Sequence, residues 1–309
     1  MGYKAFSKGM ICQGKQYAEN TVFEESGADS CCKKGVMHYC ETPFDCLDYY
    51  PIVDSNADFT EFAEVEPLDK VLVQDNKRAT KKLKIGAKLS FKDFIKAGIS
   101  VLVESTKNIP NEENSSGDWA KIGSSGDWAQ LGSSGDWAKI GSSGNRAQLG
   151  SSGDWAQLGS SGDWAQLGSS GYGAKIGSSG GWAKIGSSGN RAKIGSSGNR
   201  AQIGSSGDCA QIGSSGDCAQ IGSSGYGAKI GSSGDCAQIG SSGDYAVVSA
   251  IGHNSMIKAK IGSWIVLAEY DEDSKPVCVR AAQIDGKKLK PDTFYTLKNG
   301  EFTETEMED

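Results

Sequence analysis

Residues 114–149 read NSSGDWAKI GSSGDWAQL GSSGDWAKI GSSGNRAQL, which are four successive variants of one nine-residue unit. The spacing continues through GSSGDYAVV at residues 240–248, and SAIGHNSMI at residues 249–257 keeps the frame in degenerate form. Residues 114–257 therefore contain 144 residues, or 16 units of nine. A short, fixed period of this kind is typical of solenoids, in which each unit stacks on the next.

Each unit divides into a turn and a strand. Gly-Ser-Ser-Gly has the composition of a turn, in which we expect glycine to adopt positive φ and serine to bond the local backbone. The other residues alternate: Ala120 and Ile122 fall on one side, and Trp119 and Lys121 on the other. The Ala and Ile/Leu positions hardly vary between units, whereas the outward positions do. The core is therefore expected to consist of Ala and Ile/Leu.

These patterns predict a mainly β protein built on a parallel β-solenoid with two or three nine-residue units per coil, a period of 18 or 27. Both coil lengths stay open, because pairs such as Asn-Arg and Tyr-Gly recur after six units, a multiple of both two and three. With two units per coil, Trp119, Trp137 and Trp155 stack on one another. With three units per coil, the stack is Trp128, Trp155 and Trp182.

Bulky outward residues on such a frame are candidates for binding a protein partner or a second copy of the chain. The alternative is that the tryptophans pack against the rest of the protein or against one another. The candidate partner-binding residues are Trp119, Trp128, Trp137, Arg146, Trp155, Trp164, Trp182, Arg191 and Arg200. Cysteine occupies the same position in the late units, where we interpret it as a small substituent.

Calcium binding is not expected from the repeat. The calcium-binding nonapeptide reads G-G-x-G-x-D-x-U-x, but here its second glycine is serine and the aspartate comes one position early. Several units lack the aspartate altogether, as at Asn145 and Tyr172. We interpret Asp118 and its equivalents as residues that cap the turn or face solvent.

The flanking segments, residues 1–113 and 258–309, are predicted to be small domains that cover the two ends of the solenoid. In the first, an α+β domain, a short helix begins at Thr42 and ends near Tyr50, residues 59–66 form a strand, and a second helix opens after Ser90. In the second, strands and turns between Trp264 and Leu297 predict a β-meander, followed by an acidic tail.

Charge and cysteine content restrict the possible functions. Of the 309 residues, 32 are Lys or Arg and 38 are Asp or Glu, and residues 114–257 carry nine of each sign. No region is basic enough to follow a nucleic-acid backbone, so no nucleic-acid partner is expected. No apolar run of membrane-spanning length and no signal peptide is visible. The nine cysteines are then expected to be reduced thiols in the cytoplasm.

A cysteine and histidine cluster in the first domain is the only candidate site for chemistry. Cys12, Cys32, His38 and Cys40 are soft ligands of the type that zinc takes, although the spacing lacks a paired C-x2-C. A structural packing cluster is the main alternative, and a nucleophilic pair of Cys40 or Cys32 with His38 as base is another. No dinucleotide, P-loop, metalloprotease or serine-hydrolase motif is present, so we expect no enzyme activity and no other cofactor.

The whole chain also resembles an uncharacterised family of bacteriophages and gut Firmicutes. The stretch from Cys32 to Pro43 is similar to the C-x-x-G-F-H-x-C-x-x-P segment of that family, with one inserted residue and Val-Met in place of Phe. The family continues into G-S-S-G-D-x-A-x-I repeats and an A-G-H-N-S-x-A-K-A-K-x-G-S-W segment, which residues 251–264 approximate. The resemblance implies a phage or prophage setting and carries no established activity.

Three functional hypotheses follow. The leading one is a non-enzymatic scaffold whose solenoid binds a host protein, such as a defence factor, and forms homo-oligomers in the host cytoplasm. The second is a structural or adhesive protein of a virion or tail. The third is an N-terminal zinc or Cys/His module that uses the solenoid as a spacer.

Overall fold

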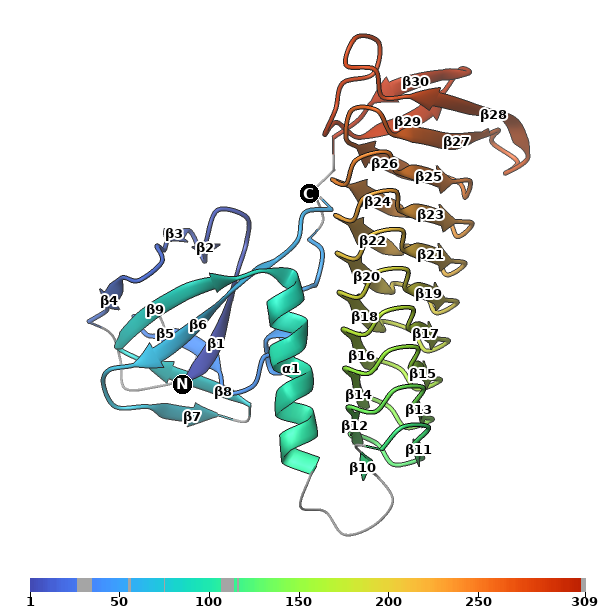
Figure 1. Cartoon of the computed structure of the whole chain (residues 1–309). Helices are drawn as coiled ribbons and strands as arrows, with labels where there is room; N and C mark the ends of the chain where they lie inside the picture. Colours follow the sequence, from blue (N-terminus) through green and yellow to red (C-terminus); the bar gives the residue numbers. More distant parts are fainter. Residues whose placement is uncertain (27–34, 55–56, 75, 107–113, 116, 307–309) are drawn as a thin grey trace.

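A computed structural model describes residues 1–26, 35–54, 57–74, 76–106, 114–115 and 117–306. Its dominant feature is a straight stack of two-stranded coils, with a β-rich N-terminal domain beside the stack and paired strands at its C-terminal end (Figure 1). The predicted parallel β-solenoid is therefore confirmed.

Two parallel sheets form the solenoid. We call the sheet that packs on the N-terminal domain the covered sheet, and the opposite one the open sheet. The covered sheet contains β10 (Asn114–Ser115), β12 (Gln130–Ser133), β14 (Gln148–Ser151), β16 (Gln166–Ser169), β18 (Lys184–Ser187), β20 (Gln202–Ser205), β22 (Gln220–Ser223), β24 (Gln238–Ser241) and β26 (Met256–Ala259). The open sheet contains β11 (Lys121–Ser124), β13 (Lys139–Ser142), β15 (Gln157–Ser160), β17 (Lys175–Ser178), β19 (Lys193–Ser196), β21 (Gln211–Ser214), β23 (Lys229–Ser232), β25 (Val247–Ala250) and β27 (Trp264–Tyr270).

Strand register decides the coil length. Lys121 pairs with Lys139 and Ile122 with Ile140. The same offset of 18 recurs along both sheets as far as β25 and β26, and Val247 then pairs with Trp264, an offset of 17. Two nine-residue units therefore make one coil, and the alternative of three units per coil is wrong. Equivalent residues of successive coils stack directly, at the spacing of about 4.8 Å between neighbouring strands.

The core consists of the expected Ala and Ile/Leu columns and of a serine column that the sequence pattern had assigned to the turn. Ala147, which directly precedes β14, and Leu149 and Ser151 within β14 are all fully buried. The strand therefore extends through the first Gly-Ser of the unit. In the early coils the inward hydroxyl accepts a hydrogen bond from the backbone two residues on, as from Gly135 N to Ser133 Oγ at 3.2 Å.

The turns use glycine differently from the expectation. Positive φ occurs at the Trp position, from 54° at Cys218 to 67° at Gly173, whereas the second glycine of the unit is not in the left-handed region. That glycine is required by close approach instead: a Cβ on Gly135 would lie 2.1 Å from the carbonyl oxygen of Gly117 in the preceding coil. Only a residue without a side chain allows the coils to stack at this distance.

The N-terminal domain is a seven-stranded sheet with one long helix. Its strand order is β4-β9-β6-β1-β5-β8-β7, and its described pairings are antiparallel. Helix α1 packs on the sheet, with the rings of Phe62 and Phe94 stacked at 3.6 Å. The elements are β1 (Gly2–Phe6), β2 (Ile11–Cys12), β3 (Lys15–Gln16), β4 (Val22–Glu24), β5 (Met37–Cys40), the 3₁₀ helix η1 (Phe44–Asp48), β6 (Glu61–Pro67), β7 (Leu72–Gln74), β8 (Lys77–Thr80), β9 (Lys82–Leu89) and α1 (Phe91–Thr106).

Both predicted helix starts are present. Ser90 Oγ accepts a hydrogen bond from Asp93 N at 3.1 Å and donates to Asp93 Oδ2 at 2.6 Å, which caps α1. The segment after Thr42 is the shorter η1, and Thr42 Oγ1 accepts from Asp45 N at 3.4 Å. The predicted strand at residues 59–66 corresponds to β6.

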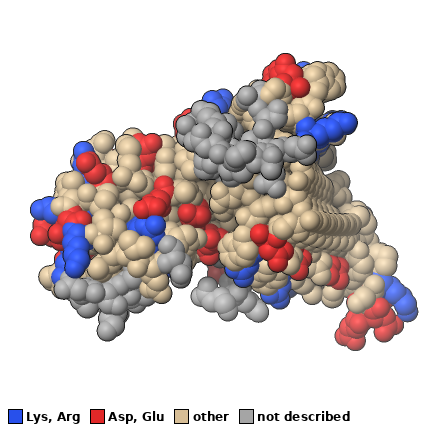
Figure 2. Space-filling view, turned by 90° about the horizontal axis from the view of Figure 1, so that it is seen from below, with Lys and Arg blue, Asp and Glu red and all other residues tan. Residues whose placement is uncertain are grey.

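Contrary to the expectation from the sequence, the described residues of the N-terminal domain do not cap the solenoid at its first coil. It lies along the side of the solenoid, with α1 against β12, β14, β16 and β18 of the covered sheet (Figure 1). Outward glycines of that sheet leave room for apolar side chains of the domain: a Cβ on Gly168 would lie 3.0 Å from Phe44 Cζ, and one on Gly186 would lie 2.7 Å from Ile95 Cδ1. Charged side chains of both signs are interspersed over the face of this domain seen in Figure 2.

The C-terminal end is covered as predicted, but each sheet is extended separately. On the open sheet, β27 pairs in parallel with β25 and antiparallel with β28 (Pro276–Gln283). On the covered sheet, β26 pairs with β29 (Tyr295–Lys298), which pairs with β30 (Glu301–Glu304). The single meander expected from the sequence is thus two hairpins, and β30 occupies part of the expected tail. None of the described helices has the length and apolarity of a membrane span.

Candidate functional site

The nine predicted partner-binding residues lie in the turns, at two opposite edges of the solenoid, and not on the strands. Because alternate units supply each edge, the set divides in two. The first edge carries Trp119, Trp137, Trp155 and Arg191, and the second carries Trp128, Arg146, Trp164, Trp182 and Arg200. We refer to them as the first and second edges.

The first edge presents a tryptophan stack. The rings of Trp119 and Trp137 lie 5.2 Å apart at 7°, and those of Trp137 and Trp155 lie 5.5 Å apart at 10°. Trp137 is stacked on both faces, yet Trp119, Trp137 and Trp155 remain 66%, 41% and 41% exposed. The tryptophans therefore pack on one another and still offer a continuous aromatic surface.

The second edge combines aromatic and cationic side chains in the order Trp128, Arg146, Trp164, Trp182, Arg200. The guanidinium of Arg146 lies 4.7 Å from the ring of Trp128, and that of Arg200 lies 4.7 Å from the ring of Trp182. Trp164 and Trp182 stack at 5.0 Å. Such cation–π pairs hold the exposed side chains in order.

The second edge faces a cleft of about 720 Å³ beneath the N-terminal domain. On the domain side, η1 contributes Asp45 and Asp48 to this cleft, where burial raises the pKa of Asp45. Gln166 of β16 donates to Asp48 Oδ1 at 3.0 Å across it. The second edge is thus partly covered by the chain itself.

Aspartate and asparagine of the turns form a ladder between coils. Asp118 Oδ1 accepts from Asp136 N at 3.0 Å, and Asp217 Oδ1 accepts from Asp235 N at 3.1 Å. Asn145 makes the same bond to Asp163 N at 2.9 Å, so a carboxylate is not required. These oxygens satisfy the backbone of the following coil, in agreement with the turn-capping interpretation.

The late coils carry free thiols at the edges. Cys209, Cys218 and Cys236 are exposed and unbridged. Cys218 and Cys236 are neighbours on the second edge, and burial together with the adjacent Cys218 raises the pKa of the Cys236 thiol. The tryptophans of the two edges are therefore confined to the early coils, whereas the late coils carry exposed cysteines and, at the first edge, the exposed Tyr226 and Tyr245.

The two sheets differ in a charge pattern that the sequence alone did not reveal. The outward position before each inward Ile or Leu is Lys or Gln, and the two-unit coil sorts these residues by sheet. Among the repeat strands of the covered sheet only Lys184 is a lysine at this position, and burial lowers its pKa. The open sheet carries an exposed lysine row, Lys121, Lys139, Lys175, Lys193 and Lys229.

Three of the four predicted metal ligands line the same pocket of the N-terminal domain. Cys12, His38 and Cys40 line a pocket of about 240 Å³, and Cys32 lies outside the described residues. Within the described ranges, no group of three or more His, Cys, Asp or Glu side chains is arranged to hold a metal ion. The four-ligand zinc site stays a prediction.

A buried lysine, which motif reasoning missed, lies at the centre of this pocket. Lys4 Nζ donates to the His38 carbonyl at 2.8 Å and lies 5.3 Å from the ring of Tyr17. Cys12 Sγ lies 3.0 Å from Tyr50 Oη. Burial lowers the pKa of Lys4, so its environment disfavours the ammonium form.

The titrating groups around the pocket favour neutral forms. Burial, aided by the charges of Lys77 and Lys4, lowers the pKa of His38 to about 4. A hydrogen bond with Cys40, together with burial, raises the pKa of Cys46. A neutral His38 is chemically able to act as a base or a ligand at pH 7, and the same contacts equally suit a packed cluster.

Comparison with known proteins finds a match only for the N-terminal part of the chain. Residues 1–97 match a family described as a domain of unknown function, DUF7666. The match ends within α1 and does not include the solenoid. No curated protein and no solved structure matches the chain.

Proposed function

We propose that this protein is a non-enzymatic scaffold whose solenoid binds another protein through its first edge. The observation that carries the proposal is the stack of Trp119, Trp137 and Trp155. These large aromatic side chains are held in register by the two-unit coils and remain exposed. Tryptophan is among the residues most enriched in the central contacts of protein interfaces.

The character of the repeat supports this role. Residues 114–257 carry equal numbers of basic and acidic groups, which disfavours attraction of a polyanion to the solenoid as a whole. A stacked frame also keeps the aromatic side chains in place before binding, which reduces the entropy that association costs. In the phage or prophage setting that the sequence resemblance implies, the partner would be a host protein, with a defence protein as one candidate.

The test is a comparison of captured proteins. Full-length protein and a Trp119→Ser, Trp137→Ser, Trp155→Ser variant are used as baits in extracts of the source cell, and the captured protein is then purified and mixed with each. Tyr245→Ser is the control, because Tyr245 is 63% exposed at the same edge in a late coil. A stoichiometric complex that the triple variant loses and the control keeps supports the proposal. The same complex with the triple variant contradicts it.

Homo-oligomerisation through the first edge is part of the same proposal. Sedimentation of the wild-type protein and the triple variant tests it directly. If the wild-type protein sediments as a monomer at high concentration, homo-oligomerisation is refuted, but the proposed binding of another protein is not affected.

The N-terminal pocket supports a second candidate function. A 240 Å³ pocket lined by Lys4, Cys12, His38 and Cys40 is a reasonable place for a metal or a small ligand. Zinc analysis of the purified protein, with His38→Ala and Cys40→Ala variants, tests this candidate. One equivalent of zinc that both variants lose supports a zinc module, and absence of metal from active protein argues against it.

A further inference from the structure

The two sheets present the same outward glycine row, but only one row is occupied by the chain itself. In each repeat strand the residue after the inward Ile or Leu is glycine and points outward, flanked by Lys or Gln two positions earlier. The covered sheet buries its glycines under the N-terminal domain, whereas those of the open sheet face solvent. The covered sheet therefore shows what this surface accepts.

On the covered sheet, the glycines receive bulky apolar side chains. A Cβ on Gly186 would lie 2.7 Å from Ile95 Cδ1 and 3.3 Å from Phe91 Cζ. A Cβ on Gly204 would lie 3.1 Å from the same atom of Phe91, and closer still to Ile52 Cγ2 at 2.6 Å and Phe59 Cε1 at 3.0 Å, which precede the helix in the chain. Phe91 and Ile95 are one helical turn apart, so one face of a helix running along the solenoid axis fills successive rungs of the row.

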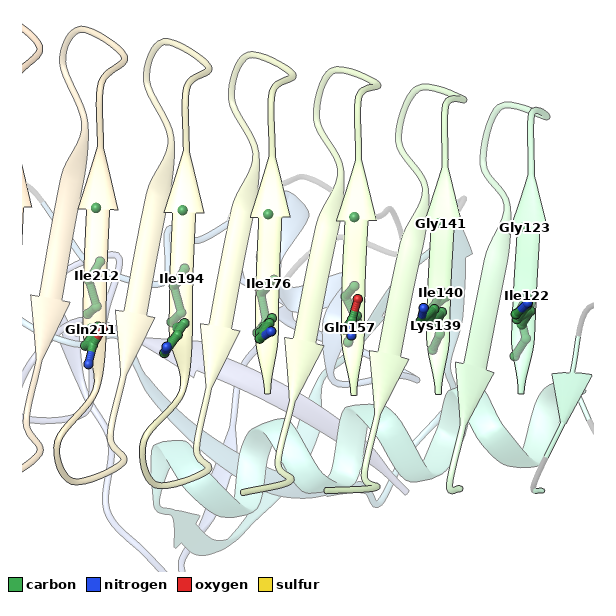
Figure 3. Close-up of a pocket in the computed structure, with 18 residues that line it drawn as sticks. Ile122, Gly123, Lys139, Ile140, Gly141, Gln157, Ile176, Ile194, Gln211 and Ile212 are labelled. Atoms are coloured by element: carbon green, nitrogen blue, oxygen red, sulfur yellow. The ribbon is translucent and has the colours of Figure 1, made fainter. Parts of the chain in front are cut away.

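On the open sheet, the corresponding row is empty. We call it the open groove, and six glycines line it: Gly123, Gly141, Gly159, Gly177, Gly195 and Gly213. It has a volume of about 1020 Å³. Four members of the lysine row border it, Lys121, Lys139, Lys175 and Lys193, together with Gln157 and Gln211, which take the same position in their strands (Figure 3). A Cβ on Gly159, Gly177, Gly195 or Gly213 would meet nothing within 4 Å.

The open glycines are therefore not required by the fold of the chain. Glycine within a strand is unfavourable relative to residues with side chains, and it commonly marks a place where another chain approaches closely. At the neighbouring outward position the units do vary, between Lys and Gln. Six rungs at about 4.8 Å give a groove of about 24 Å, the length of about 16 helical residues at 1.5 Å each.

The lysine row specifies the charge of the occupant. No ion pair joins Lys121, Lys139, Lys175, Lys193 or Lys229 to any other residue in the described part of the chain. A second copy placed face to face would bring two such rows into one interface, which like-charge repulsion disfavours. A partner with carboxylates along one flank is complementary instead.

We infer that the open groove binds an amphipathic helix of a protein partner, with Phe- or Ile-type side chains seated over the glycines and acidic residues along the lysine row. The inference rests on the proposed protein-binding function but assigns a different surface from the first edge. It follows from the covered sheet, where an identical row already holds α1, and from the substitution of lysine for glutamine beside the open row.

The test uses a labelled helical peptide with the sequence of residues 91–106 in which Lys92→Glu and Lys96→Glu create an acidic flank. Its affinity for the full-length protein is measured by fluorescence anisotropy and compared with that of the unmodified peptide. We expect the acidic peptide to bind at least tenfold more tightly. Filling the groove with Gly177→Val and Gly195→Val should weaken binding at least tenfold.

A second variant separates charge from shape. Lys175→Gln and Lys193→Gln leave the glycines in place, so binding should weaken several-fold and lose most of its salt dependence. Circular dichroism and thermal unfolding establish that each variant is folded. No binding of the acidic peptide, or equal binding by the glycine-filled variant, overturns the inference.

Other occupants give distinct results. If heparin displaces the peptide and binds the wild-type protein and the glycine-filled variant equally well, the lysines bind a polyanion. This result overturns the inference. Self-association that Gly177→Val abolishes indicates a second copy and also overturns it. If a captured partner loses binding when Trp119, Trp137 and Trp155 are replaced but binds the groove variants as tightly as the wild type, the result supports the proposed function and refutes this inference.

Discussion

Valine substitutions at Gly186 and Gly177 test whether the glycine row of the covered sheet holds the N-terminal domain in place. The two glycines occupy the same position in identical Lys-Ile-Gly-Ser strands, β18 and β17. A change in strand propensity or in the unfolded chain therefore affects both variants equally. They differ in what lies above them: Gly186 is under Ile95 and Phe91, and Gly177 is open.

The expected magnitudes follow from that difference. Replacing a strand glycine gains about 0.5–1 kcal/mol in either sheet. At Gly186 the new Cβ would lie 2.7 Å from Ile95 Cδ1, and overpacking of this kind costs about 1–3 kcal/mol. Gly177→Val should therefore be slightly more stable than the wild type, and its free energy of unfolding should exceed that of Gly186→Val by about 1–3 kcal/mol.

Urea denaturation monitored by circular dichroism measures the free energies of unfolding, and hydrogen exchange of the α1 amides reports docking directly. Faster exchange in α1 is expected for Gly186→Val alone. Equal unfolding free energies and equal exchange in the two variants would refute the view that glycine positions the N-terminal domain.

Three further predictions concern the turn ladder, the N-terminal pocket and the late-coil thiols. Asp217→Ala removes the acceptor of Asp235 N and should lower the free energy of unfolding by about 1 kcal/mol. Asp217→Asn keeps an acceptor oxygen and should keep the wild-type stability. Equal stability of the two variants in urea denaturation would contradict the ladder. The pKa of His38 is about 4 in the folded state and 6.5 ordinarily, so between these values the unfolded chain binds the proton and the folded chain does not. The free energy of unfolding should therefore fall as pH drops from 6.5 to 4. His38→Gln should flatten this part of the curve of stability against pH. Mild oxidation should join Cys218 and Cys236 before Cys12, Cys40 or Cys46 reacts, since Cys218 and Cys236 are exposed neighbours and the other three are buried. Peptide mapping checks the order.

The nine-residue pattern was sufficient to predict the solenoid and most of its core. Alternation placed Ala and Ile/Leu inside, and glycine and serine excluded a helix. The same reasoning assigned the wrong role to glycine, because a sequence shows that a side chain is absent but not which atoms approach that position. In the structure, Gly135 is required by the carbonyl of Gly117 in the preceding coil, whereas the left-handed turn position carries Trp, Arg or Cys.

The candidate sites were also predicted only in part from the sequence. Motif reasoning found Cys12, His38 and Cys40, which line one pocket, but it missed Lys4, a residue outside any motif that only the sheet brings there. It also found the tryptophans of both edges, and the stack of Trp119, Trp137 and Trp155 that it gave for two units per coil is confirmed, but it left the coil length open. Each edge receives alternate units, and knowledge of the two-unit coil was needed to see this.

The sequence by itself determined a periodic β fold, its inward columns and its neutral balance of charge, because these depend on local alternation and composition. Tertiary structure decided the coil length, the place of the N-terminal domain and the difference between the two sheets. Lys and Gln look interchangeable along the chain. They become a lysine row on one sheet and a nearly uncharged row on the other only when two-unit coils bring every second unit together.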